Sequence, residues 1–176
     1  MLSSFISKLI VVRQFSLLEN EFKILGENFY LQPIKSLVAF QDKVEEKFGK
    51  KGLDLIYETS KESFVEFAKE MKKFAESEEK FFDVLLKLIS HFGFGNLEIV
   101  EIDKKGRRAL VEVKNNPFAK EYIKKFGFQK KCVDHLLAGI IAGYFSEFFK
   151  EKVKCEEKGC IAKKNLSCKF LVEKAK

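Results

Sequence analysis

The stretch of sequence that decides the fold is CVDHLLAGIIAGYFSEFFKEKVKCEEKGCIAKKNLSCKFLVE, residues 132–173. From Val133 to Phe148 its apolar residues recur every three or four positions, which is the period of one helix face and predicts a helix over 132–149. Apolar and polar residues then alternate near 152–157 and 167–172 and predict two strands joined by a loop. This mixture of a helix and strands indicates an α+β fold.

Small residues gather on the predicted helix at Ala138, Gly139, Ala142 and Gly143. A glycine costs about 1 kcal/mol relative to alanine in a helix interior, so two of them need a compensating gain. We therefore expect a neighbouring backbone or a ligand to approach this helix closely.

The preceding residues carry the same two kinds of pattern. We expect a hairpin or meander over about 14–32 and a strand pair within 97–113 around a Gly-containing turn. The predicted helices cover 3–12, 34–48, about 53–75, 78–91 with Ser77 as its cap, and Pro117 to near Gly127. This organisation predicts an N-terminal extension, residues 1–32, followed by one domain, residues 33–176.

Composition excludes several classes of protein. Of the 176 residues, 46% are apolar and 34% are charged, which excludes a disordered chain. No apolar stretch approaches the ~20 residues of a membrane span. Residues 2–12 are interrupted by Lys8 and lack a cleavage site, so they do not form a signal peptide. We therefore expect a cytoplasmic protein.

The net charge of +7 comes mainly from lysines near the C-terminus and in residues 124–131. Arginine, which base-reading surfaces prefer, occurs only at positions 13, 107 and 108. We interpret the lysines chiefly as a solvated face, with a polyanion site as the alternative, and regard nucleic acid as an improbable partner.

Four cysteines follow position 131 and suggest a metal site. Cys155, Cys160 and Cys168 surround a loop rich in lysine and glycine, and Cys132 precedes the long helix. Thiolates hold zinc in tetrahedral sets of four. Glu157 points the same way as Cys155 along a strand, so either residue can face the ion, and His135 is a further candidate. Buried free thiols and disulfides remain alternatives.

Motifs for catalysis are lacking. The chain has no Gly-rich phosphate loop and no GxSxG motif, and its two histidines, His91 and His135, stand far apart. Tyr144 lies on the apolar stripe beside Gly143, where it belongs either to the core or to a pocket wall.

The C-terminal half resembles the 4-vinyl reductase domain family. The shared signature is a helix with G-x-x-x-G-Y, then E-x-x-C, then C-x-F, carried here by Gly139, Gly143, Tyr144, Glu157, Cys160, Cys168 and Phe170. The hairpin and short helix within GFGNLEIVEIDKKGRRALVEVKNNPFA also match, and residues 13–33 resemble the extension of stand-alone archaeal members.

The resemblance implies a fold related to TRAPP-complex subunits, in which an antiparallel sheet packs against several helices beside a zinc-stabilised C-terminal lobe. It implies zinc ligands at Glu157, Cys160 and Cys168, with Cys132 or His135 completing the set and Cys155 as an alternative to Glu157. It also implies an enclosed site for an apolar or aromatic molecule, for which we expect Tyr144, Ile140 and Phe94 as lining residues.

Three functions compete at this point. The first is a sensory or regulatory protein that binds a small apolar molecule. The second is a TRAPP-like dimerising adaptor, and the third, suggested by the family's name, is reduction of a tetrapyrrole vinyl group. We also expect a homodimer formed by helical surface in the N-terminal half, with five phenylalanines as contacts: Phe64, Phe67, Phe74, Phe81 and Phe82.

Overall fold

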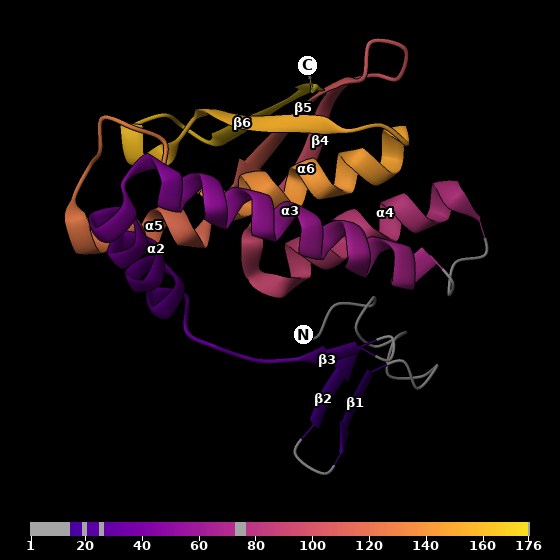
Figure 1. Ribbon diagram of the computed structural model, residues 1–176, viewed down its shortest axis with the longest axis horizontal. Helices are drawn as coiled ribbons and strands as arrows, with labels where there is room; N and C mark the ends of the chain where they lie inside the picture. The colour runs from indigo at the N-terminus through magenta and orange to yellow at the C-terminus, as the bar shows by residue number, and fades with distance from the viewer. Residues whose placement is uncertain (1–14, 19–20, 25–26, 73–76, 176) are drawn as a thin grey trace. The chain divides into compact units, whose positions relative to one another are not determined.

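The computed structural model in Figure 1 describes residues 15–18, 21–24, 27–72 and 77–175. The chain forms two compact units, Met1–Pro33 and Ile34–Lys176. The first contains an antiparallel meander of β1 (Phe15–Leu18), β2 (Glu21–Ile24) and β3 (Glu27–Phe29), as expected for 14–32. The helix expected at 3–12 lies outside the described residues. The division into an extension and a binding domain stays a prediction.

The second unit is built on a four-stranded antiparallel sheet with the order β4-β5-β7-β6. Its strands are β4 (Asn96–Asp103), β5 (Arg108–Lys114), β6 (Val153–Gly159) and β7 (Cys168–Lys174). Along β5, β6 and β7 every second side chain is buried, because successive side chains point to opposite faces of a sheet. One face therefore carries the apolar core, and the α+β prediction with an antiparallel sheet is confirmed.

Five helices pack with this sheet: α2 (Ile34–Phe48), α3 (Lys50–Lys72), α4 (Glu78–Ile89), α5 (Pro117–Phe126) and α6 (His135–Phe149). Two short helical turns, η1 (Ser90–Phe94) and η2 (Ile161–Lys163), lie between elements. Ser77 caps α4 as predicted, since its hydroxyl accepts the backbone N–H of Lys80. Within the described part of the chain, none of the helices combines the length and the apolar character needed to cross a membrane.

Helix α6 lies between the sheet and α3 (Figure 1), and ten of its fifteen residues are buried. Its glycines allow the two helices to touch. A Cβ atom added at Gly139 would lie 2.3 Å from the carbonyl oxygen of Tyr57, and one at Gly143 would lie 2.7 Å from that of Lys61. The predicted close approach of a neighbouring backbone is therefore confirmed, and the backbone is that of α3.

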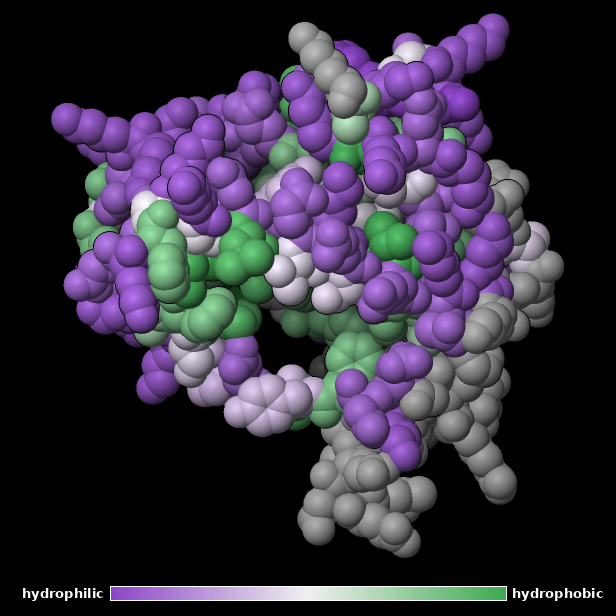
Figure 2. Space-filling view, viewed as in Figure 1, coloured by the Kyte–Doolittle hydropathy of each residue, from purple (hydrophilic) through white to green (hydrophobic). Residues whose placement is uncertain are grey.

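The face drawn in Figure 2 is mostly hydrophilic, but it shows an apolar area at the left of the view, where Figure 1 shows α2. Exposed apolar side chains on α2 and the start of α3 include Phe40, Phe48 and Leu55. Phe81 and Phe82, expected at a dimer interface, are instead buried in this chain, with 4% of each residue exposed. Their part of that expectation is wrong, because both rings are buried within this chain, and the Phe82 ring packs against Tyr144 and Phe148 of α6. Phe74 lies outside the described residues.

Candidate metal centre

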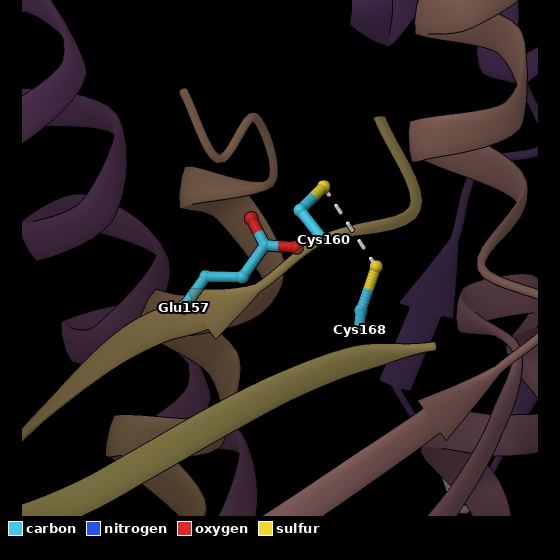
Figure 3. Close-up of side chains that lie close together, drawn as sticks. All are labelled: Glu157, Cys160 and Cys168. Atoms are coloured by element: carbon cyan, nitrogen blue, oxygen red, sulfur yellow. Dashed lines mark hydrogen bonds between the residues drawn. The ribbon is translucent and has the colours of Figure 1, made fainter. Parts of the chain in front are cut away.

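Three buried side chains converge where β6 ends and β7 begins. The ligand atoms of Glu157, Cys160 and Cys168 all lie within 4.8 Å of one another, and the two sulfurs are 3.9 Å apart. Figure 3 shows the carboxylate and both sulfurs around a common space. One carboxylate oxygen and two thiol sulfurs form a donor set that can hold a metal ion.

The turn between the two strands sets the position of Cys160. Its carbonyl oxygen accepts the backbone N–H groups of Lys163 and Asn165, and its own N–H donates to the Asn165 side chain at 2.9 Å. Lys164 adopts a positive φ of 69°, which closes η2 and returns the chain toward β7. Backbone hydrogen bonds therefore hold Cys160 opposite Cys168, the first residue of β7.

Glu157 is bound on one side only. Its Oε2 atom accepts the backbone N–H groups of Val133 and Asp134, both at 3.0 Å. Its Oε1 atom is buried and has no hydrogen-bond partner among the described residues. A buried carboxylate oxygen without a partner is costly, and coordination to a cation beside the two thiols would supply that partner. The residues therefore fit a bound metal.

The protonation of this cluster follows from its burial. Burial raises the pKa of Glu157 to about 9, and the nearby Asp134 and Cys160 add to the effect. Hydrogen bonds from Cys132 and Cys168 lower the pKa of Cys160 and raise their own. Without a metal, the carboxylate and the thiols of this cluster share protons, because their negative charges disfavour one another in a buried site. A divalent cation would instead favour the charged form of each ligand.

Cys132 reaches the cluster from the segment before α6. It is half-buried, and its thiol interacts with that of Cys160. It is not one of the three residues whose ligand atoms all lie within 4.8 Å of one another. Because the next two residues, Val133 and Asp134, are bonded to Glu157, the backbone holds Cys132 at the edge of the centre.

Two other candidate ligands lie outside this group. Cys155 is buried on the same face of β6 as Glu157, as the alternation predicts, and its backbone N–H donates to the Tyr57 hydroxyl at 2.9 Å. His135 begins α6 and lies among charged side chains of other segments, including Glu45, Lys131 and Asp54. Burial lowers the pKa of His135.

Sequence analysis missed the polar residues that support the centre. Asp134 caps α6 by accepting the backbone N–H of Leu137 at 3.0 Å, and Asn116 caps α5 through Ala119 at 2.9 Å. The Asn116 amide also donates to Asp134 at 2.8 Å, and both residues are buried. Each stands directly before the apolar pattern or proline of its helix, a cap signal that could have identified it. The helix predicted from 132 starts at 135 for this reason.

The residues expected to line a ligand pocket lie in and near an aromatic cluster. Tyr144 is buried and its hydroxyl donates to the carbonyl oxygen of Phe82 at 3.1 Å. Ile140 is buried one turn earlier on α6, while Phe94 is half-buried in η1, which packs against α4, α5 and β4. The cluster around Tyr144 comprises Phe82, Phe145 and Phe148, with ring centroids 4.9 to 6.3 Å from that of Tyr144.

No protein-family profile and no curated protein sequence matches this chain. Solved structures do. The phenol-responsive sensory domain of the transcription activator PoxR, solved with phenol, has a TM-score of 0.79 at 16% identity, covering 99% of this chain and 92% of that one. This similarity of fold extends over nearly the whole chain.

Two further structures share the fold over most of the chain. A trafficking protein particle complex subunit 3 from Naegleria fowleri, covalently bound to palmitic acid, has a TM-score of 0.54 at 14% identity, covering 81% of this chain and 95% of that one. A vinyl-4-reductase family protein from Methanocaldococcus jannaschii has a TM-score of 0.50 at 18% identity, covering 84% and 98%. The chain therefore shares its fold with these three structures.

Proposed function

We propose that this protein is a sensory or regulatory module that binds a small apolar or aromatic molecule, with a zinc ion stabilising its C-terminal lobe. The observation that carries the proposal is the similarity to the PoxR sensory domain across 99% of the chain. The aromatic cluster around Tyr144 supports it, because ligand sites for such molecules are lined mainly by apolar and aromatic side chains.

Zinc is the metal that this donor set favours. Glu157, Cys160 and Cys168 would hold the ion, and Cys132 is the fourth ligand because it already contacts Cys160. Thiolate-rich tetrahedral sets select zinc over magnesium or calcium, which prefer oxygen ligands. With four protein ligands the site has no open position, so its role is structural.

Ligand binding can be tested with phenol on the full-length chain. We expect phenol to raise the melting temperature and to perturb the NMR signals of aromatic residues on α6. Ile140→Trp, which adds bulk one turn from Tyr144, should abolish the response, whereas Leu55→Ser on the exposed face of α3 should keep it. Absence of any response to phenol and to larger apolar compounds such as naphthalene, with no co-purified molecule in native mass spectra, would refute the proposal.

A dimerising adaptor is the second candidate. The similarity to the trafficking complex subunit favours it, as do the exposed Phe40, Phe48 and Leu55 on α2 and α3. If two copies associate through this face, the protein should sediment as a dimer at micromolar concentration. The Phe40→Glu, Phe48→Glu double variant should sediment as a monomer. A strict monomer in the unmodified protein would exclude it.

A further inference from the structure

Two segments far apart in sequence meet beside the metal centre and form a basic and apolar surface. The first, residues 124–131, begins in the last turn of α5 and continues beyond the helix. The second, residues 158–166, contains η2. The backbone N–H of Gln129 donates to the carbonyl oxygen of Ala162 at 2.7 Å and joins them. Figure 1 shows both segments at the left end of the four-stranded sheet. We call this surface the lysine-loop face.

The lysine-loop face displays apolar side chains to solvent. Leu166 is completely exposed, Phe128 is 60% exposed and Phe126 is 36% exposed. Large apolar side chains at loop positions gain nothing from folding when they stay in water, so their exposure suggests a use outside the monomer. The turn that carries Leu166 is held by the backbone bonds of Cys160 and Asn165, so this display is a fixed part of the lobe.

Lysines surround these apolar side chains. Residues 124–131 contain four lysines and residues 158–166 contain three, with no acidic residue in either segment. Within the described part of the chain, Lys130, Lys163 and Lys164 form no ion pair. The Lys164 amine lies 5.3 Å from the centre of the Phe128 ring, and that of Lys125 lies 4.6 Å from the centre of the Phe126 ring. The other four lysines pair with acidic residues outside the two segments. The face therefore combines apolar tips with three lysines whose charge is not offset by an ion pair with any described residue.

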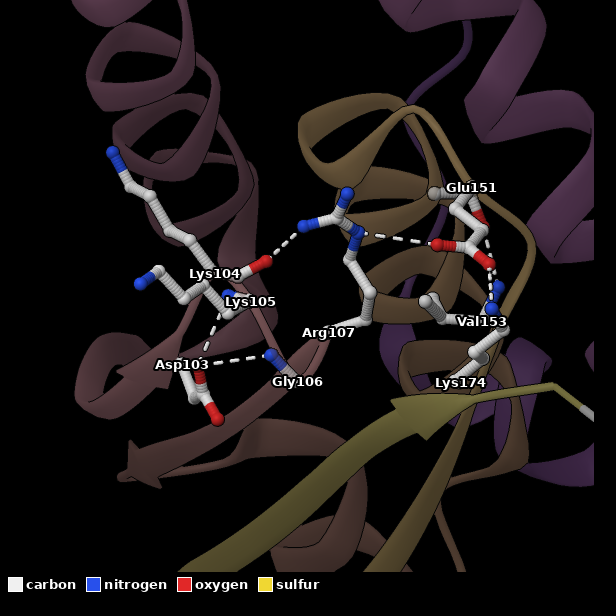
Figure 4. A network of polar contacts seen from close by, with 9 residues as sticks. Asp103, Lys104, Lys105, Gly106, Arg107, Glu151, Val153 and Lys174 are labelled. Atoms are coloured by element: carbon white, nitrogen blue, oxygen red, sulfur yellow. Dashed lines mark hydrogen bonds and ion pairs between the residues drawn. The ribbon is translucent and has the colours of Figure 1, made fainter.

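The opposite end of the sheet differs. There the β4–β5 turn is also basic and part of its charge is paired (Figure 4): the Arg107 guanidinium donates to Glu151 at 3.1 Å, and Lys174 at the end of β7 pairs with the same carboxylate. Asp103 accepts the backbone N–H groups of Lys105 and Gly106 and closes the turn. This end offers a basic control surface, on which the amines of Lys104 and Lys105 lie outside the ion pairs drawn in Figure 4.

We propose that the lysine-loop face binds the surface of an anionic lipid bilayer. Peripheral proteins do so by inserting apolar tips at the level of the headgroups while neighbouring lysines remain at the phosphates. Each lysine near an anionic surface strengthens binding about five-fold. The leucine and the two phenylalanines insert only a short way into the bilayer and add a small apolar contribution to the binding free energy. Binding is therefore weak and reversible, and it depends on both the lysines and the apolar side chains.

A nucleic acid fits the same face less well. Neither segment contains an arginine, the residue that most often contacts bases and stacks on them. The lysines over the two phenylalanine rings occupy faces on which a base would stack. A fully exposed leucine offers a base no flat surface and no hydrogen bond, whereas acyl chains accept it readily.

Vesicle co-sedimentation of the full-length protein tests the proposal. We expect binding to vesicles of phosphatidylcholine mixed with phosphatidylglycerol, weakening as salt rises, and little binding to pure phosphatidylcholine. Lys163→Glu with Lys164→Glu should weaken binding about 25-fold or more. The matched pair Lys104→Glu with Lys105→Glu, which changes the net charge equally at the opposite end of the sheet, should have a much smaller effect.

The apolar tips are tested separately. Phe128→Ser with Leu166→Ser should weaken vesicle binding while leaving retention on a cation exchanger unchanged, and Leu55→Ser on α3 should bind as the unmodified protein does. The proposal would be overturned if the unmodified protein bound neutral and anionic vesicles equally well. It would also be overturned if the two lysine pairs lost the same amount of vesicle binding, or if the serine pair lost none. Binding of single-stranded poly(U) that exceeds vesicle binding would likewise overturn it and would indicate a nucleic-acid surface.

Discussion

The carboxylate of Glu157 accepts the backbone N–H of Asp134 at 3.0 Å, so the residue that ends the inward face of β6 is bonded to the residue that caps α6. The second carboxylate oxygen of Glu157 is buried and has no hydrogen-bond partner among the described residues, and this carboxylate lies beside Cys160 and Cys168. A metal held by this carboxylate would therefore be linked through one side chain to the start of the helix that forms the centre of the core.

Cys160→Ser should release the metal and loosen the C-terminal lobe. A hydroxyl replaces a thiolate ligand, and the free energy of metal binding appears as stability of the elements that the ligands join. Hydrogen exchange should accelerate in residues 153–174, while α2 and α3 remain protected. Cys155→Ala is the matched control, because Cys155 is buried on β6, the strand that precedes Cys160, but lies outside the cluster. This variant should retain one metal per chain by native mass spectrometry. Equal metal content in both variants would contradict the assignment.

Glu157 should contribute stability to the metal-free protein that is lost as the pH rises, while Cys160, whose pKa is lowered in the folded chain, contributes with the opposite sign. The pKa of Glu157 is raised by burial to about 9 in the folded chain, above its value of roughly 4.3 when unfolded. The folded state therefore holds a proton that the unfolded state releases, and the free energy of unfolding falls by up to about 1.4 kcal/mol per pH unit between these values. Urea denaturation in chelator at pH 5.5, 7 and 8 measures this slope.

Glu157→Gln separates this effect from other titrations. The glutamine carries no proton to lose, so the variant should lack the fall in stability that Glu157 contributes above pH 6, while the contribution of Cys160 remains in both proteins. Asp134, whose pKa burial raises to about 6, leaves a residual slope below that pH in both proteins. With zinc present the unmodified protein should show the reverse trend, since the metal displaces protons from its ligands. The same slope in both metal-free proteins would exclude Glu157 as the source.

Asp134→Ala should destabilise the fold by about 2–3 kcal/mol, because it removes a buried helix cap and leaves the Asn116 amide without its acceptor. Ser77→Ala removes the exposed cap of α4 and should cost only about 0.5–1 kcal/mol. Urea denaturation of both variants gives the comparison. The backbone N–H of residue 134 is unchanged, so metal content should stay the same. A loss of metal together with stability would show that the cap acts through the ligands.

Much of this architecture could be predicted because it depends on local patterns. The spacing of apolar residues predicted α6 and the strands around it, and the cysteines around the loop from Cys155 to Cys168 predicted a metal site. The pattern could not decide between Cys155 and Glu157, because both lie on one face of β6. That choice depends on η2, which turns the chain back so that Cys160 and Cys168 meet beside Glu157.

Other features depend on contacts between distant segments. Phe81 and Phe82 look like excess apolar residues in the sequence, yet both are buried, Phe82 against Tyr144 of α6 and Phe81 against Phe82. Gln41 is buried on α2 because its amide donates to the carbonyl oxygen of Val133 at 2.6 Å, a contact across 92 residues. No local signal indicates such a pair, since only the packing of α2 beside the start of α6 creates it.

Gly139→Ala should separate α3 from α6 and destabilise the protein by about 2–3 kcal/mol. The added methyl group would lie 2.3 Å from the Tyr57 carbonyl oxygen, a backbone atom that cannot move without its helix. Moving α3 also strains the 2.9 Å hydrogen bond between the Tyr57 hydroxyl and the backbone of Cys155, which ties α3 to β6. The loss should lower the melting temperature by about 5–10 °C for a chain of this size.

Gly159→Ala is the control for this substitution. A methyl group there would meet its nearest neighbour, the Lys169 Cβ atom, at an ordinary 3.6 Å, so its effect should stay within about 0.5 kcal/mol. Gly143→Ala, with a contact of 2.7 Å to the Lys61 carbonyl oxygen, should resemble Gly139→Ala. Melting curves followed by circular dichroism distinguish the three variants. If Gly139→Ala melted at the same temperature as Gly159→Ala, the close packing of α3 on α6 would not explain why this helix contains glycine.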